Sequence, residues 1–375
     1  MTSNPGLFTL CIEMKSLRLF IGVLFLGAFA FGAWKAFELL QFASVPWVKG
    51  SKQSIILDIH KGGSRQKIAD ELKAQGVIGN VQDFIWLGRI THRWAKLKAG
   101  EYEFSPSMTP LQIFDILDSG ISVAFPFTIP EGNNMYQVAE TLEEKGFGSH
   151  ETYLQLFRDA SFIATLQMGE PKTLEGYLYP ETYSFPHRTQ PIEIVRKMVH
   201  TFKAHWAPEF NQSAKVLGLT PYQVVTLASV IEKETGAPEE RPLISSIFHN
   251  RLRKHMRLES DPTTIYGIWD RYAGKIHKSD LLQMTPYNTY KVSGLPAGPI
   301  CNPGLDAITA ALHPAQTDYF YFVSHNDGTH QFSKTYKEHA AAVRKFQLDP
   351  RAREGKSWRD LSLKKVPTKT HESQQ

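Results

Sequence analysis

The chain has 375 residues, of which 42% are hydrophobic and 21% charged, so it is long enough to form two or three globular domains. Its net charge of +5 is mild and gives no argument for binding to nucleic acid, although it suits work beside anionic lipid or wall polymer. The two cysteines, Cys11 and Cys301, are too few for a disulfide framework.

An uncharged apolar stretch at residues 19–34 has a basic residue at each end. As a helix it would cover about 24 Å, and apolar neighbours extend it toward the ~30 Å core of a bilayer. We therefore predict a cytoplasmic N-terminus (residues 1–16) followed by a single transmembrane helix (residues 17–40). The alternative is a cleaved signal peptide, because residues 28–30 form a small-x-small site. Either interpretation exports the rest of the chain.

The next segment contains an internal repeat. The sequence around Gly62 recurs without gaps around Gly132, seventy positions later. Each copy is typical of a strand, a Gly turn, a helix with apolar positions four apart, and a Gly helix stop. In the first copy, the pattern continues with a helix at residues 81–88, a strand at 100–104 and a helix at 109–117.

From residue 127 the pattern predicts a mixed α+β domain. The expected helices are residues 135–145, 151–157, 191–206 and 220–235, and the expected hairpin pairs residues 319–323 with 330–332. Between the helices, residues 174–183 alternate aromatic side chains with carboxyls, which suits a sugar-binding cleft. A buried strand pair with core tyrosines explains the same pattern equally well.

The helix expected at residues 220–235 has clear boundaries. Thr220 is a good N-cap, Pro221 fits the first helical position, and Gln223 stands where it completes a capping box. The spacing of its apolar residues indicates a stripe facing a core. These residues are Val224, Leu227, Ala228 and Ile231.

Glu234 is the next position on that stripe. Burial at the edge of an apolar face disfavours the charged form, so the pKa of Glu234 should rise toward the range of a general acid. Glu232 lies ~200° away around the helix axis. The structural alternative is that Glu-Lys-Glu at this helix end is only a solvated polar cap.

Several motifs follow one another in a recognisable order. They are ASVIEKET at residues 228–235, NRL at 250–252, SDPTTIYG at 260–267, YNTY at 287–290, GLPAGPI at 294–300 and NPG at 302–304. Together they resemble the YceG-like family of endolytic murein transglycosylases, and the resemblance extends over roughly residues 50–345.

The resemblance implies an α+β fold with a LysM-like module (residues 51–122) and a YceG-like catalytic domain (residues 123–348). It also implies lytic cleavage of the MurNAc-GlcNAc β-1,4 bond in nascent peptidoglycan strands. In that reaction, the 6-hydroxyl of the muramic acid attacks C1 and leaves a 1,6-anhydro end, while one glutamate serves as base and acid in turn. Unlike a hydrolase, such an enzyme needs no second carboxylate, and we expect no cofactor and no metal.

The resemblance also helps to choose the glutamate. Glu234 with Thr235 is similar to the Glu-Ser pair of other lytic transglycosylases and goose-type lysozymes, so we predict that Glu234 is catalytic. The predicted substrate-binding residues are Glu175, Tyr179, Glu232, Asp261, Tyr287, Asn288 and Tyr290. Because it precedes a proline, Asp261 should be held extended toward the cleft, or else it only forms a turn.

For its location, the resemblance implies the inner (cytoplasmic) membrane, with the catalytic domain in the periplasm and with membrane-bound peptidoglycan synthases as partners. Whether the LysM-like module contacts glycan through Trp86 and Trp94, or is only a spacer, stays open at this point. The basic tail at residues 349–375 is expected to be disordered. Two rival functions are a non-catalytic wall-binding scaffold and a true muramidase that uses Asp261 or Glu232 as its second carboxylate.

Overall fold

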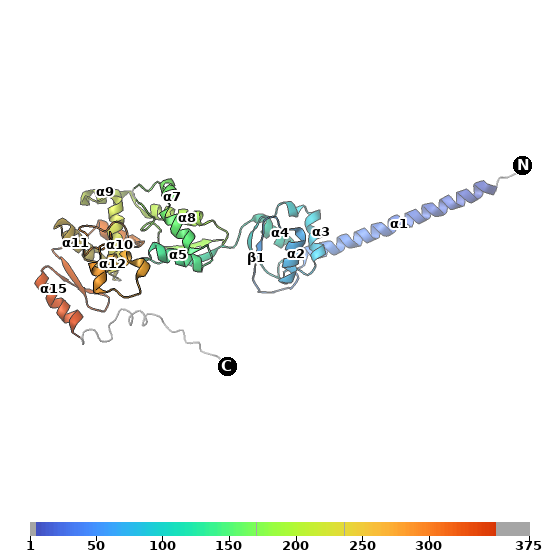
Figure 1. Cartoon of the computed structure of the whole chain (residues 1–375). Helices are drawn as coiled ribbons and strands as arrows, with labels where there is room; N and C mark the ends of the chain where they lie inside the picture. The colour runs from blue at the N-terminus through green and yellow to red at the C-terminus, as the bar shows by residue number, and fades with distance from the viewer. Residues whose placement is uncertain (1–4, 170, 236, 350–375) are drawn as a thin grey trace, which may run out of the picture. The chain divides into compact units, whose positions relative to one another are not determined.

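The computed structural model describes residues 5–169, 171–235 and 237–349, so most of the expected disordered tail lies outside the described residues. The chain forms two compact units. Unit 1 consists of Met1–Phe125 with Phe185–Arg188, and unit 2 consists of Pro126–Ser184 with Thr189–Gln375. Figure 1 shows the elements of each unit along the chain.

Unit 1 is built on one antiparallel strand pair covered by helices. Strand β1 pairs with β2 so that Ile55 lies opposite Phe104 and Ile59 opposite Gly100. The elements in order are α1 (Pro5–Ser44), β1 (Ile55–Ile59), α2 (Arg65–Ala74), α3 (Val81–Ile90), the 3-10 turn η1 (Arg93–Ala95), β2 (Gly100–Phe104) and α4 (Pro110–Ser119). The strand expected at residues 100–104 is confirmed, and so are the two helices expected beside it.

The end of helix α1 belongs to the core of unit 1. Ala43 is buried there, and Leu39 and Phe42 pack against the same cluster. Over the residues searched, Val23–Ser44 is long and apolar enough to cross a membrane. Because the last turns of this helix are packed among α3 and α4, unit 1 is joined to α1 without a flexible linker.

The seventy-residue repeat is confirmed in three dimensions. Strand β3 (Phe125–Thr128) and helix α5 (Met135–Glu144) begin seventy positions after β1 and α2. The turn glycines Gly62 and Gly132 both have positive φ, which glycine adopts without steric cost. The helices bury equivalent side chains, namely Ile68, Ala69 and Leu72 in the first copy and Val138, Ala139 and Leu142 in the second.

Unit 2 is mainly helical. Its elements after α5 are α6 (His150–Arg158), α7 (Ala160–Thr165), β4 (Thr182–Phe185), α8 (Pro191–His205), α9 (Pro208–Leu217), α10 (Pro221–Glu234), η2 (Pro238–Glu240), α11 (Arg241–Arg253), α12 (Asp261–Gly267), η3 (Trp269–Arg271), α13 (Lys278–Leu282), α14 (Leu305–Leu312), β5 (Tyr321–Ser324), β6 (His330–Ser333), α15 (Tyr336–Val343) and the π-helical turn η4 (Arg344–Leu348). Strand β3 pairs with β4, and β5 pairs antiparallel with β6. The expected hairpin at residues 319–332 is therefore confirmed.

Helix α10 is the central helix of unit 2, and its environment corrects the one-sided stripe expected from the sequence. All eight residues from Val224 to Ile231 are buried, on every face of the helix. The second face carries Val225, Thr226, Ser229 and Val230, and its two hydroxyls donate to backbone carbonyls of the same helix. Ser229 illustrates this, since its Oγ donates to Thr226 O at 2.7 Å and accepts from Ile300 N at 3.0 Å. Helix α14 packs closely along α10.

Candidate active site

Helix α10 delivers two glutamates to its C-terminal end. Its start is fixed by the expected capping box, in which Thr220 Oγ1 accepts from Gln223 N at 3.3 Å and Gln223 Oε1 accepts from Thr220 N at 2.9 Å. The helix ends at Glu234, after which Thr235 is extended. Since the helix is held by the core along its length, Glu232 and Glu234 have fixed positions at the edge of that core.

Glu234 is half-buried, and a hydroxyl holds its carboxyl. The Ser260 Oγ donates a hydrogen bond to Glu234 Oε1. Ser260 is the residue before α12 and would ordinarily cap that helix, but its side chain makes no capping bond. Its hydroxyl is directed to Glu234 instead.

A rigid segment holds Ser260 in this position. The Thr289 Oγ1 accepts from Ser260 N at 3.0 Å, and Thr263 Oγ1 donates to Ser260 O at 2.6 Å. Upstream, the buried Arg251 guanidinium donates to the carbonyls of Arg257 and Leu258 at 3.1 and 3.0 Å. Arg251 therefore fixes the loop that brings Ser260 to the glutamate.

Burial raises the pKa of Glu234 to about 7, because the charged carboxylate is poorly solvated at this position. The hydrogen bond from Ser260 opposes this rise, the negative charge of Asp261 adds to it, and the Arg251 guanidinium lowers it slightly. A carboxyl with this pKa exchanges protons readily near neutral pH, as a general acid and base must.

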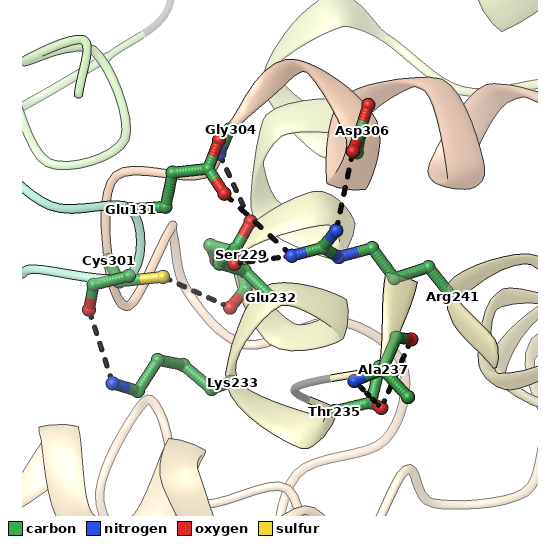
Figure 2. A network of polar contacts seen from close by, with 11 residues as sticks. Glu131, Ser229, Glu232, Lys233, Thr235, Ala237, Arg241, Cys301, Gly304 and Asp306 are labelled. Carbon is green, nitrogen blue, oxygen red and sulfur yellow. Dashed lines mark hydrogen bonds and ion pairs between the residues drawn. The ribbon is translucent and has the colours of Figure 1, made fainter. Parts of the chain in front are cut away.

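Glu232 faces a different set of groups, shown in Figure 2. Its Oε1 accepts from Arg241 at 3.1 Å, and its Oε2 accepts from the backbone N–H of Gly304 at 3.1 Å. The side chain is only 6% exposed. The sequence argument that Glu232 would be less buried because of its place on the helix is therefore wrong, since Arg241 and the start of α14 cover it.

Arg241 also meets two further carboxylates, Glu131 at 3.8 Å and Asp306 at 3.5 Å. Burial, followed by the charge of Glu232, raises the pKa of Glu131. On the same helix end, Lys233 donates to Gly132 O at 3.2 Å. The turn of the second repeat copy therefore contacts both sides of this corner, with Gly132 bonded to Lys233 at the end of α10 and Glu131 facing Arg241 at the start of α11.

Asp261 and Tyr290 lie beside the Ser260 segment. Asp261 is exposed and accepts a 2.7 Å hydrogen bond from the Tyr290 hydroxyl. Asp261 begins helix α12 with Pro262 in its first turn, which corrects the expectation of an extended residue. A proline is tolerated there because the first-turn N–H groups have no partner within the helix.

Glu175 is buried in a separate group at the other end of α12. Its carboxylate oxygens accept from Met135 N at 3.1 and 3.0 Å, and Tyr266 also hydrogen-bonds to it. Burial raises the pKa of Glu175 to about 7. The Tyr287 ring packs edge-on against Tyr266 at 4.7 Å, and burial raises the pKa of Tyr287 to about 12.

The last two predicted binding residues are also buried. The Asn288 amide nitrogen donates to three backbone carbonyls, the shortest bond being 2.6 Å to Gln283 O, and its oxygen accepts from Thr264 and from the Tyr290 N–H. Tyr179 stacks on His205 with ring centroids 4.2 Å apart. The structure thus gathers Asp261 and Tyr290 near Glu234, and distributes Glu175, Tyr179 and Asn288 in the interior.

The motifs at residues 250–252 and 260–267 include Arg251 and Ser260, but sequence reasoning assigned no role to either of them or to Arg241. Each acts through contacts outside its own helix, as Arg251 does with the Phe320 carbonyl at 2.7 Å, and the periodicity of a helix does not encode such contacts. One signal was available for Ser260, because a serine directly before Asp-Pro is a good candidate to cap a helix. Nothing local indicated that its hydroxyl would turn to Glu234.

A buried helix that ends in a carboxyl of raised pKa, held by one hydroxyl, has the groups needed for acid–base chemistry. The comparisons with known proteins agree on one family. The model of the YceG-like family matches residues 57–345. The chain therefore belongs to the YceG-like family.

Individual relatives cover most of the chain. An endolytic murein transglycosylase of Bacillus subtilis (strain 168) is 33% identical over 335 residues, which make up 85% of this chain and 90% of that protein. One of Streptococcus pneumoniae serotype 2 (strain D39) is 27% identical over 84% of this chain, which spans only 63% of that longer protein. A crystal structure of a yceG-like protein from Listeria monocytogenes matches with a TM-score of 0.55 at 33% identity, covering 78% of this chain and 99% of that one.

Proposed function

We infer that this protein is a peptidoglycan lytic transglycosylase that cuts glycan strands internally. Relatives that carry this activity in their names match the chain over most of its length. The observation that carries the mechanism is Glu234, a half-buried carboxyl at the end of α10 with a pKa of about 7 and, within the described part of the chain, a single hydroxyl partner. One group of this kind can both give and accept a proton at neutral pH.

The proposed reaction consumes no water. Protonated Glu234 gives its proton to the oxygen of the MurNAc-GlcNAc bond while the bond from that oxygen to C1 breaks. The Glu234 carboxylate then takes the proton of the 6-hydroxyl on the same MurNAc as O6 bonds to C1. The products are a free 4-hydroxyl on GlcNAc and a 1,6-anhydro-MurNAc end, and Glu234 returns to its protonated form.

Ser260 and Asp261 have opposite effects on this proton transfer. The Ser260 hydrogen bond stabilises the carboxylate, whereas the Asp261 charge favours the protonated acid. With Glu234 held between them, neither protonation state is strongly preferred near pH 7. Asp261 also offers a carboxylate that could stabilise the positive charge developing at C1.

For substrate binding, we propose that Asp261 and Tyr290 contact the strand directly. Among the predicted binding residues near Glu234, Asp261 is exposed and Tyr290 is partly exposed, and a 2.7 Å hydrogen bond joins their side chains. Glu175, Tyr179 and Asn288 are buried, so we assign them to the support of the segments around the site. Glu232 with Arg241 supports the helix end, and we place Tyr287 with Tyr266 in the packing beneath α12.

We propose that α1 anchors the protein in the inner membrane with the N-terminus in the cytoplasm and both units in the periplasm. The supporting facts are the apolar stretch Val23–Ser44 and the basic residues before the apolar segment. An anchored cutter would act on strands that emerge at the membrane, where peptidoglycan synthases extend them. Such synthases are therefore the proposed partners.

A second candidate is a muramidase, favoured by the electrostatic effect of Asp261 on Glu234, since hydrolases need two carboxylates. Mass spectrometry of peptidoglycan strands digested by the full-length protein tests both. We expect products one water lighter than hydrolase products, lost with Glu234→Gln and retained with Glu239→Gln, an exposed acid on the same stretch. Reducing ends would assign the protein to the hydrolases.

The glutamate is tested in the same assay. With Glu232→Gln we expect anhydro products to persist, because this residue contacts Arg241 and Gly304 and not Ser260. Thermal unfolding of each variant separates lost chemistry from lost folding. A folded Glu232→Gln protein without activity, beside an active Glu234→Gln protein, would reverse the assignment. Strand binding without cleavage by the unaltered protein would favour the scaffold.

A further inference from the structure

Helix α3 lies beside the point where α1 leaves its uncharged stretch. Lys35 is the first charged residue after that stretch, and its Nζ lies 2.7 Å from the Glu38 carboxylate. One turn further along α1, Glu38 lines a cavity of about 310 Å³ together with Asp83. The start of α3 therefore lies beside α1 about one turn beyond Lys35, while Phe42 and Ala43 further along belong to the interior of unit 1.

Asp83 shares a face of α3 with two exposed apolar residues. Trp86 and Ile90 follow it by three and seven positions, so their side chains project in nearly the same direction. Trp86 is 53% exposed and Ile90 61% exposed. The buried side chains of α3, namely Phe84, Ile85 and Leu87, fill the core. Packing within unit 1 thus leaves this pair uncovered.

Apart from Asp83 at the start of α3, the charged neighbours of the exposed pair along the chain are positive. The Arg89 guanidinium lies 5.3 Å from the Trp86 ring centre, and Lys96 is exposed just beyond η1. Residues 84–100 contain no acid. By contrast, Arg93 in the same stretch is neutralised by Asp115 at 2.9 Å and Asp118 at 2.5 Å.

Tryptophan beside arginine or lysine is the combination that settles at the boundary between hydrocarbon and lipid headgroups. We propose that this α3 face, made of Trp86, Arg89, Ile90 and Lys96, binds the anionic phospholipid headgroups of the membrane that α1 enters. The inference rests on the proposed anchor. Trp94, the other tryptophan offered by the sequence, packs between Phe84 and Phe114 and donates to Ile85 O, so it takes no part.

Binding at this face would hold unit 1 against the bilayer surface. The helix α1 fixes one point of the unit, and the α3 face would supply a second point. Each cationic side chain near an anionic surface strengthens attachment by about fivefold. The position of unit 1 would then depend on the content of anionic lipid and on salt.

The test uses the full-length protein in nanodiscs. A fluorophore is attached at Ile90→Cys or, in a parallel sample, at Phe29→Cys within the apolar part of α1, with Cys11 replaced by Ser. Cys301 is buried and unpaired, so it is not labelled in the folded protein. Quenching by nitroxide-bearing lipid is measured in phosphatidylglycerol and in phosphatidylcholine discs.

We expect quenching at both positions in phosphatidylglycerol discs. At position 90 the quenching should be at least threefold weaker in phosphatidylcholine discs. It should be weakened by the same factor when Arg89→Glu and Lys96→Glu are added to the labelled protein. Quenching at position 29 without quenching at position 90 would overturn the inference and leave the anchor intact. No quenching at position 29 would overturn the anchor and the inference with it. If lipid does not quench the fluorophore at position 90 but added glycan strands protect it, the face binds wall polymer and the proposal is overturned.

Discussion

Two glutamates separated by one residue have different partners in this structure. Glu232 is bonded to a buried arginine and a backbone N–H, so both of its oxygens are occupied by donors. Among the described residues, Glu234 has one hydrogen-bond partner, the Ser260 hydroxyl, and it is half-buried. Because a general acid must lose and regain its proton during turnover, the less firmly bound carboxyl is the better catalyst.

Ser260→Ala should impair proton transfer without unfolding the protein. The hydroxyl stabilises the Glu234 carboxylate, so its removal raises the pKa of Glu234 further. We expect the pH–activity curve to move to higher pH and kcat to fall by about tenfold, since the carboxyl also loses its fixed orientation. Ser260→Thr keeps the hydroxyl and should restore the unaltered profile. An unchanged pH profile in Ser260→Ala would show that the contact has no influence on the reaction.

The raised pKa of Glu234 also has a consequence for stability. The group moves from an ordinary value of 4.5 to about 7 on folding, so the folded protein binds this proton more tightly than the unfolded chain. Its contribution to stability is fully present below about pH 4.5 and is lost as the pH rises to about 7.

Glu234→Gln removes that dependence. The free energy of unfolding of the unaltered protein minus that of Glu234→Gln should fall by up to about 3 kcal/mol between these pH values, and then stay constant. Urea unfolding at a series of pH values measures this difference, in which the similar effect of Glu175 cancels. A difference that stays flat across the range would mean that Glu234 is not desolvated.

Among the elements, α10 and the repeat show how much of the architecture could be predicted. The capping box at Thr220, the length of α10 and the repeat of strand and helix are local patterns, and all are confirmed. The sequence did not reveal α14 along α10, or Arg251 and Arg241 in the interior. Those contacts join positions such as Ser229 and Ile300 that are remote in sequence, and they depend on packing rather than on periodicity.

One such remote contact is made by Gly176, which passes close to α10. Its φ is +88°, and a Cβ there would stand 2.7 Å from Pro299 and 2.8 Å from Val225. Gly176→Ala should therefore lower the free energy of unfolding by about 3 kcal/mol, through backbone strain and overpacking together. Gly218→Ala is the matched control, since it has φ +70° and open space, and should lose only about 1 kcal/mol. Equal losses in chemical denaturation would contradict the packing at Gly176.

At the scale of the whole molecule, α1 is part of unit 1 as well as the proposed anchor. Ala43→Glu places a charge in the core of unit 1 and should destabilise that unit by about 3 kcal/mol or more. Gln41→Glu adds the same charge at an exposed position and should have little effect. Limited proteolysis of unit 1 in the full chain measures the difference. Equal resistance of the two variants would show that α1 ends outside the core.

This arrangement also affects how a soluble form should be made. A chain that begins at Lys49 would lack Leu39, Phe42 and Ala43, all of which pack in unit 1. A chain that begins at Lys35 keeps them. The boundary for soluble protein is therefore set by packing and not by the end of the apolar stretch.

The proposed reaction differs from hydrolysis most directly in the oxygen that forms the new bond to C1. Peptidoglycan strands would be digested by the full-length protein in water enriched in oxygen-18, and the new ends analysed by mass spectrometry. We expect anhydro ends that carry no oxygen-18, because O6 of the same sugar closes on C1 with Glu234 as the only proton carrier. Reducing ends that carry one oxygen-18 atom would show that water attacks C1, and would contradict the mechanism proposed for Glu234.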